Sequence, residues 1–293
     1  MVDPTDPKWL AVLATSQLLW AVLHVAVASL FRNQLIVWLG KQRYITAFAA
    51  TSLGWFGANT LLLSWVTPGV PLFAMPVALD TVGTVIRLVA YLLLLTLLWA
   101  QPSPMDIAAQ RVRRLAQRNE STRLANADFY PSDVAPEQSD GLTKIVRHPQ
   151  FFGFALLLVS LLLSDGVTAA EVAYAAPALA LVVLGIGFQE RRMLSDATVR
   201  DFLQQTSNIP GWAVITGRTT LSWRELGQLG HHAAIPAMLV GGLVMLGLLG
   251  GESARQALTP NYPQAAWFIF AYIILLALRE ITATLTSRHL RAT

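Results

Sequence analysis

A few ionisable side chains lie inside or at the ends of long apolar segments, where a charge is costly. His24 lies within the first of these segments. A neutral imidazole at such a depth can ligate a haem iron or carry a proton. It can also simply hydrogen-bond a carbonyl group of a neighbouring helix. The residue type leaves these roles open.

Arg147, His148 and Pro149 open another apolar segment. Pro149 suits the first turn of a helix, where its missing N–H is not needed. A helix N-terminus attracts anionic groups such as a propionate, carboxylate or phosphate, and Arg147 would strengthen that attraction. Since basic residues are also common at membrane boundaries, anion binding and an ordinary helix start remain alternatives.

Glu190, Arg191 and Arg192 close a further apolar segment. They form either part of a binding site or a boundary cluster whose long side chains reach out of the membrane. Asp80 and Arg87 are seven residues apart, so on a helix they share one face. They line a polar cavity or make structural contacts within a helical bundle.

The elements that must position these residues are membrane helices. The chain has 293 residues, of which 54% are hydrophobic and 13% are charged, about half the usual charge of a soluble domain. Cysteine is absent, which excludes disulfides, thiolate metal sites and cysteine nucleophiles. Seven segments are long enough to be considered as spans. They are roughly 9–31, 44–66, 71–100, 150–165, 168–188, 231–250 and 264–284.

With seven spans, all of the basic loops fall on one side of the membrane: those after the first, third and fifth spans, and the C-terminus. Because basic loops favour the cytoplasmic side, this predicts an outside N-terminus and a cytoplasmic C-terminus. We therefore expect an all-α transmembrane bundle in one integral membrane domain, 1–293, with cytoplasmic connections at 101–149 and 189–230 and two C-terminal spans in 231–293. A basic amphipathic helix is expected at 104–125. This topology puts His24, His148 and Glu190 in the cytoplasmic half, and His231 and His232 at the same side.

Three stretches resemble a known superfamily: "RHPQFFGF" (147–154), "GFQERRM" (187–193) and "FLQQTSNIPGWAVITGR" (202–218). The N-terminal run "WLGKQRYITAFAATSL" (38–53) agrees with it. The chain resembles the NnrU family of bacterial membrane proteins, which includes the plant and cyanobacterial 15-cis-zeta-carotene isomerases. More distantly it is similar to isoprenylcysteine carboxyl methyltransferases. The resemblance covers about 15–225 and places the chain in the cytoplasmic (inner) membrane of a bacterium.

The isomerase branch implies haem b with a histidine of the first conserved helix as an axial ligand, and His24 occupies the matching position. The second histidine of that branch falls at Leu161 here, so a second ligand would be His148, one of His231 and His232, or none. The NnrU branch implies a role in denitrification and nitric-oxide metabolism.

The methyltransferase branch implies S-adenosylmethionine bound at the cytosolic face by residues that match Arg147, His148 and Glu190. The Phe-Gly and paired tyrosines usual after its Glu-Arg pair are not clearly present here.

The leading hypothesis is a haem-b protein with His24 as metal ligand, and with Arg147 and His148 holding an anionic group. It would act on or beside an apolar isoprenoid-like molecule, or in nitrogen-oxide metabolism. The alternatives are methyl transfer to a lipid-like acceptor, with Arg147 and Glu190 binding the cofactor, and a non-catalytic subunit of a membrane complex. Expected partners are the lipid bilayer, an apolar small molecule and a membrane protein, but no nucleic acid. The sequence names no catalytic residue.

Overall fold

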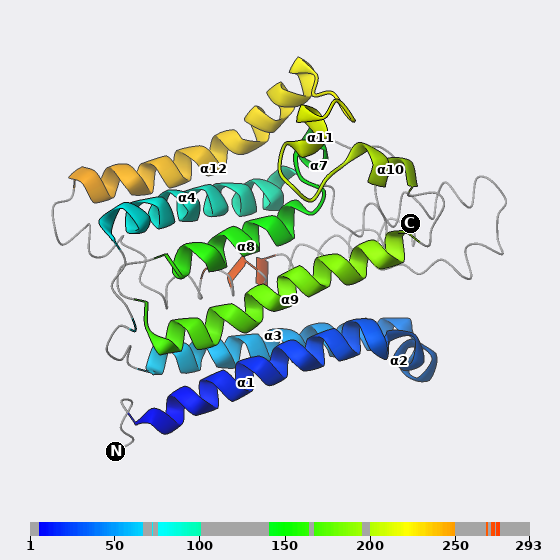
Figure 1. Cartoon of the computed structure of the whole chain (residues 1–293), viewed down its shortest axis with the longest axis vertical. Coiled ribbons are helices and arrows are strands. Elements are labelled where there is room, and N and C mark those ends of the chain that lie inside the picture. The colour runs from blue at the N-terminus through cyan, green and yellow to red at the C-terminus, as the bar shows by residue number, and fades with distance from the viewer. Residues whose placement is uncertain are drawn as a thin grey trace, which may run out of the picture. The chain divides into compact units, whose positions relative to one another are not determined.

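The computed structural model of the chain describes residues 6–66, 72, 76–100, 141–163, 167–194, 200–249, 268, 271–272 and 274–275. Within these residues the chain is almost entirely helical and forms no β-strand (Figure 1). The elements are α1 (Pro7–Val25), the π-helical turn η1 (Ala26–Leu30), α2 (Arg32–Leu39), α3 (Lys41–Trp65), α4 (Val77–Ala100), α7 (Gly141–Ile145), α8 (Pro149–Leu161), α9 (Ala169–Leu194), α10 (Arg200–Gln205), α11 (Trp212–Ile215) and α12 (Trp223–Leu249). The expected all-α class is confirmed for this part of the chain.

Three helices are long and apolar enough to cross a bilayer: Pro7–Val25, Ala78–Leu97 and Ala169–Phe188. They coincide with the first, third and fifth predicted spans. The apolar helix α8 is shorter, and its 13 residues cover about 20 Å of the roughly 30 Å hydrocarbon core. The chain is therefore an all-α protein with membrane-crossing helices, whereas the count of seven spans and the orientation stay predictions. The helix expected at 104–125 and most of the span expected at 264–284 lie outside the described residues.

Two of the predicted spans contain a local feature of the backbone. Within the segment 71–100, α4 begins at Val77, directly after Pro76, whose carbonyl oxygen accepts from Leu79 N at 2.8 Å. A proline just before the first helical residues is a common start. The segment 9–31 is divided, since α1 ends at Val25 and Phe31 N bonds Ala26 O, five residues back. That spacing defines a π-helical turn.

The chain forms two compact units, which we describe separately. The first unit comprises Met1–Leu94, Gln150–Ile186 and Pro236–Ile273. The second unit comprises Leu95–Pro149, Gly187–Ile235 and Ile274–Thr293. The expectation of a single integral membrane domain stays a prediction.

A buried polar network joins α1, α3 and α9 in the first unit. Asn59 Nδ2 donates to Gln17 Oε1 at 2.6 Å, and Gln17 Nε2 donates to Tyr174 O at 3.2 Å. Ser16 Oγ donates to Asn59 Oδ1 at 2.6 Å, and Trp55 Nε1 donates to Ser16 Oγ at 2.9 Å. Buried amides are costly without partners, so these bonds fix the register of the three helices. The same pairing of α1 with α3, which lie side by side in Figure 1, positions the residues around His24.

In the second unit, residues 207–226 wrap around the segment 144–147, and we call residues 207–226 the strap. Arg147 N donates to Ser207 O at 2.7 Å, and Gly211 N donates to Ile145 O at 2.7 Å. Further along, Lys144 Nζ donates to Thr220 O at 3.0 Å and pairs with Glu225 at 2.6 Å. Both ends of the strap are thus tied to the few residues that precede α8.

Candidate functional sites

His24 lies in an aromatic environment in the first unit. Its ring centroid is 4.7 Å from that of Phe48 and 5.3 Å from that of Trp20. His24 Nδ1 is 2.9 Å from Ser52 Oγ on α3, and the Ser52 carbonyl accepts from Trp20 Nε1 at 3.3 Å. The position of Ser52, held between α1 and α3, therefore fixes the orientation of the imidazole.

This imidazole lines a pocket of about 240 Å³ formed by α1, α2 and α3. Its lining is mostly apolar and comprises Trp20, Leu23, His24, Val27, Leu35, Leu39, Tyr44, Ala47, Phe48, Thr51, Ser52 and Trp55. The Tyr44 hydroxyl donates to Val27 O at 3.0 Å. His24 is the one imidazole in the lining.

The lining of this pocket offers one side chain that could ligate a metal ion, His24. When the Ser52 hydroxyl accepts from Nδ1–H, the Nε2 atom of His24 carries a lone pair, which is the usual arrangement of a ligating histidine. The volume is below the 300–1,000 Å³ or so of typical ligand pockets, so a macrocycle would be only partly enclosed. In the described part of the chain, including this pocket, no cluster of three or more His, Asp, Glu or Cys side chains could hold a metal ion.

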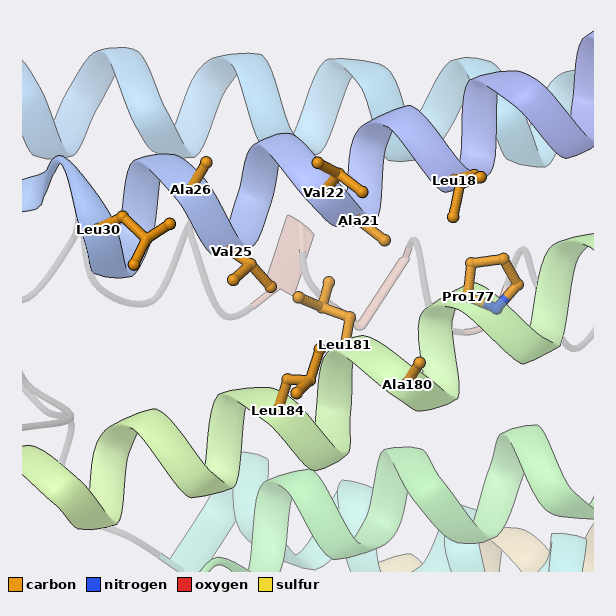
Figure 2. A pocket seen from close by; sticks show the side chains of 10 residues that line it. All are labelled: Leu18, Ala21, Val22, Val25, Ala26, Leu30, Pro177, Ala180, Leu181 and Leu184. Atoms are coloured by element: carbon orange, nitrogen blue, oxygen red, sulfur yellow. The ribbon is translucent and has the colours of Figure 1, made fainter.

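A second apolar cavity of about 270 Å³ lies between α1 and α9, also in the first unit (Figure 2). It is lined by Leu18, Ala21, Val22, Val25, Ala26, Leu30, Pro177, Ala180, Leu181 and Leu184. None of these side chains is ionisable or nucleophilic. The cavity can accept hydrocarbon but offers no group for chemistry, and its α1 residues alternate with those that face the His24 pocket.

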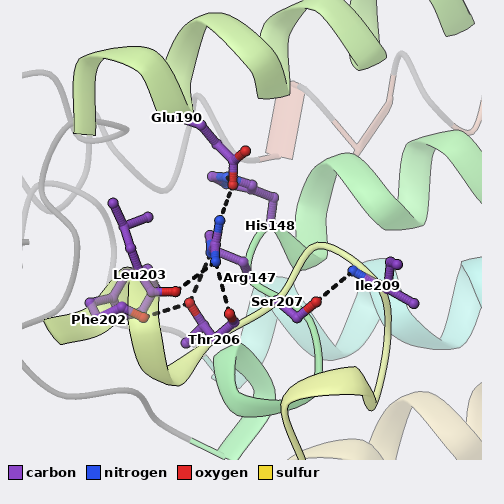
Figure 3. Close-up of polar contacts among 8 residues, drawn as sticks. All are labelled: Arg147, His148, Glu190, Phe202, Leu203, Thr206, Ser207 and Ile209. Atoms are coloured by element: carbon purple, nitrogen blue, oxygen red, sulfur yellow. Dashed lines mark hydrogen bonds and ion pairs between the residues drawn. The ribbon is translucent and has the colours of Figure 1, made fainter. Parts of the chain in front are cut away.

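In the second unit, Arg147 is the centre of a polar clamp (Figure 3). Its guanidinium forms an ion pair with Glu190 of α9. Nε donates to Thr206 Oγ1 at 2.9 Å, and Nη2 donates to the carbonyl oxygens of Leu203 and Thr206, each at 2.8 Å. Thr206 is itself fixed, since its hydroxyl donates to Phe202 O at 2.7 Å. The donors of Arg147 are thus directed to acceptors of the protein, which makes the clamp a structural joint between α9 and the residues after α10.

His148 lies beside this clamp and is buried. Its Nε2 is 3.9 Å from Glu190 Oε1, which is beyond hydrogen-bond distance. Burial lowers the pKa of His148 to about 4, although the Glu190 carboxylate acts in the opposite direction. A neutral His148 therefore accompanies the ion pair at neutral pH.

The structure brings together three of the four candidate site residues of the sequence. Arg147, His148 and Glu190 meet in the second unit, whereas His24 belongs to the first. The assignment of these residues to cofactor binding stays a prediction. Leu161, at the family position of the second histidine, is buried in the first unit.

The remaining sequence candidates have other surroundings. Arg87 bonds Ser160 of α8, with Nη2 donating to Ser160 O at 3.2 Å, which favours a structural role in the first unit. The side chain of His231 is exposed on α12. The side chains of Arg192 and His232, and all of His289, lie outside the described residues.

A family model described as "NnrU protein" matches residues 12–249. The chain belongs to the NnrU family. The suspected resemblance is thereby confirmed, and family membership together with the three apolar helices identifies an integral membrane protein. No curated protein and no solved structure matches the chain.

All four candidate site residues lie within the NnrU match. Sequence reasoning missed Ser52 and Thr206, the residues that orient His24 and Arg147. Ser52 lies within the family-like run 38–53, which was a usable signal, but its bond to His24 spans 28 positions. Thr206 is 59 positions from Arg147, and a threonine in a polar connection carries no signal of its own.

Proposed function

We propose that this NnrU-family protein binds haem b in the membrane, with His24 as the axial ligand, and acts on an apolar isoprenoid-like molecule at or beside the same pocket. One observation carries the proposal. His24 lines an aromatic pocket while its Nδ1 is held 2.9 Å from the Ser52 hydroxyl. A second-sphere partner on one ring nitrogen is what orients the other nitrogen toward a metal.

The chain's own residues supply orientation and an apolar medium. Ser52 holds the ring of His24 by a hydrogen bond at Nδ1, and the rings of Trp20 and Phe48 restrict its rotation. The apolar lining excludes water and selects hydrocarbon over polar molecules. Haem, when bound, supplies an iron centre able to act on conjugated double bonds or to bind a nitrogen oxide.

The pocket lining supports one protein ligand rather than two. His24 is the one imidazole in the lining, and the Tyr44 hydroxyl is engaged with Val27 O. Leu161 stands where the isomerase branch has its second histidine. We therefore expect that His24 alone would hold a haem in this pocket, and that the reduced, haem-loaded protein would combine with carbon monoxide.

The test is the absorbance of the purified full-length protein, expressed with haem available and extracted in mild detergent. The wild type should show a Soret band, and a pyridine extract should identify haem b. His24→Ala should abolish the band. Thr51→Val is the matched control, because it changes a pocket-lining side chain without removing a nitrogen donor.

Retention of the band in His24→Ala, or protein that stays colourless with haem supplied, would contradict the proposal. Colourless protein whose melting temperature rises with S-adenosylmethionine would favour methyl transfer instead. Colourless protein that co-purifies with a stable membrane partner would favour the accessory subunit.

A further inference from the structure

The strap, residues 207–226, presents an apolar outer face although both of its ends are tied to the protein. Ile215 is 77% exposed and Trp223 is 88% exposed, and Ile209 and Trp212 are exposed as well. Trp212 and Ile215 lie one turn apart on α11, so they share a face, whereas Ala213 between them is fully buried. The strap is therefore two-sided, with small residues inward and large apolar residues outward.

The exposed charge of the strap is positive. Arg218 and Arg224 are both exposed, and neither has a carboxylate partner in the described part of the chain. Arg218 Nε donates to the Thr216 hydroxyl at 3.2 Å. Glu225, the acidic residue of the strap, is engaged by Lys144. A combination of tryptophan, aliphatic and arginine side chains is typical of segments that lie in the interface of an anionic membrane.

The strap directly precedes the apolar part of α12, where a segment at the membrane surface is expected. Helix α12 has 27 residues, so it is about 40 Å long and exceeds the roughly 30 Å hydrocarbon core. The predicted span, 231–250, leaves the first two turns of α12 outside that core. With that predicted span in the core, Trp223 and the strap before it would fall at the depth of the lipid headgroups.

We infer that the outer face of the strap docks into the anionic headgroup layer of the bilayer that the chain crosses. Ile209, Trp212, Ile215 and Trp223 enter the boundary of the acyl chains, and Arg218 and Arg224 pair with lipid phosphates. Through its bonds to Lys144, Ile145 and Arg147, the docked strap fixes the start of α8 at the membrane surface. This inference goes beyond the proposed function and holds whether or not haem is bound.

The absence of native cysteine allows a direct test. Ile215→Cys and Trp223→Cys, each labelled with the environment-sensitive fluorophore NBD, are reconstituted in vesicles of phosphatidylcholine with or without phosphatidylglycerol. Both probes should emit at shorter wavelengths in the anionic vesicles. They should be quenched more strongly by a spin label on the lipid headgroup than by one deep in the acyl chain, and iodide in the water should quench them weakly.

Removing the arginines tests the electrostatic half of the inference. Each arginine near an anionic surface favours the docked state by about five-fold. Arg218→Gln with Arg224→Gln should therefore remove most of the difference between the two vesicle types. Arg191→Gln is the matched control, because Arg191 is an exposed arginine of the same unit outside the strap.

Three results would overturn the inference. Probes that iodide quenches freely would place the strap in water. Probes that neither iodide nor the lipid spin labels reach would mean that a second copy or another part of the chain covers the strap. An Arg191→Gln effect as large as that of the strap variants would show that the net charge of the protein, and not the position of the strap arginines, causes the response to anionic vesicles.

Discussion

His24, which is half-buried, and His148, which is buried, lie in opposite kinds of surroundings. His24 borders a pocket in the first unit and has the single hydroxyl of Ser52 at one ring nitrogen. His148 lies in the second unit beside an ion pair whose guanidinium also donates to Thr206 and Leu203. An ionisable residue in a membrane protein can therefore lie within the packed structure, as His148 does, or border a pocket, as His24 does. The neighbours decide which, and the residue type does not.

The largest expected effect is the loss of the clamp. Arg147→Ala should lower the free energy of unfolding by about 3 kcal/mol, because Glu190 and two carbonyl groups lose their donors. The free energy of unfolding of Arg147→Lys should lie between those of Arg147→Ala and the wild type, since an ammonium keeps the charge but lacks the planar shape and the paired donors of a guanidinium. Thermal or denaturant unfolding in a fixed detergent measures both variants.

A different outcome would contradict the contrast between His24 and the Arg147 clamp. If Arg147→Ala unfolds like the wild type but no longer binds a cofactor, the guanidinium serves a ligand and the two sites are of the same kind.

The next effect concerns the orientation of His24. Ser52→Ala should weaken haem binding by about 10- to 100-fold without abolishing it, because the imidazole stays but loses its orienting partner. Haem titration of the apoprotein measures the affinity, and Ser52→Thr is the control that keeps a hydroxyl. Equal haem affinities of Ser52→Ala and the wild type would show that the hydrogen bond with Ser52 does not position the imidazole of His24.

A smaller effect depends on pH and concerns His148. Because burial lowers the pKa of His148 from 6.5 to about 4, the unfolded chain binds a proton more readily than the folded one between these values. Stability should therefore fall as the pH decreases from about 6.5 toward about 4. His148→Asn should reduce that slope in melting temperatures recorded across the range, and an unchanged slope would assign the acid sensitivity to another group.

The smallest effect is expected at the surface pair of Lys144 and Glu225. The hydrogen bond from Lys144 lowers the pKa of Glu225 from 4.5 to about 2, so its contribution is complete above about 4.5 and is lost as the pH falls toward 2. Glu225→Gln should cost little at neutral pH, because the pair is near the surface and the amide oxygen can still accept from the Ser222 N–H and hydroxyl. Melting curves of the two proteins should converge near pH 2, and a gap that persists there would point to the Ser222 contacts.

Much of the helical framework could be predicted from the sequence, because the length of an apolar run is a local property. The third predicted span contains α4, which begins directly after Pro76, and α2 was not expected because eight residues give too short a pattern. Arg147, His148 and Glu190 were expected at one membrane face, and the structure gathers them. His24 belongs to the other unit, so the expectation that it lies at the same membrane face stays a prediction.

By itself, the sequence determined the class of the protein, its NnrU family and the short list of residues that could do chemistry. Those follow from apolar length, from charge and from motifs that are contiguous in the chain. Only the tertiary structure decided what each residue faces, because a side chain's partners come from other helices. Ser52 reaches His24 across 28 positions, and Thr206 reaches Arg147 across 59. Such pairings depend on helix register and packing, which no local pattern encodes.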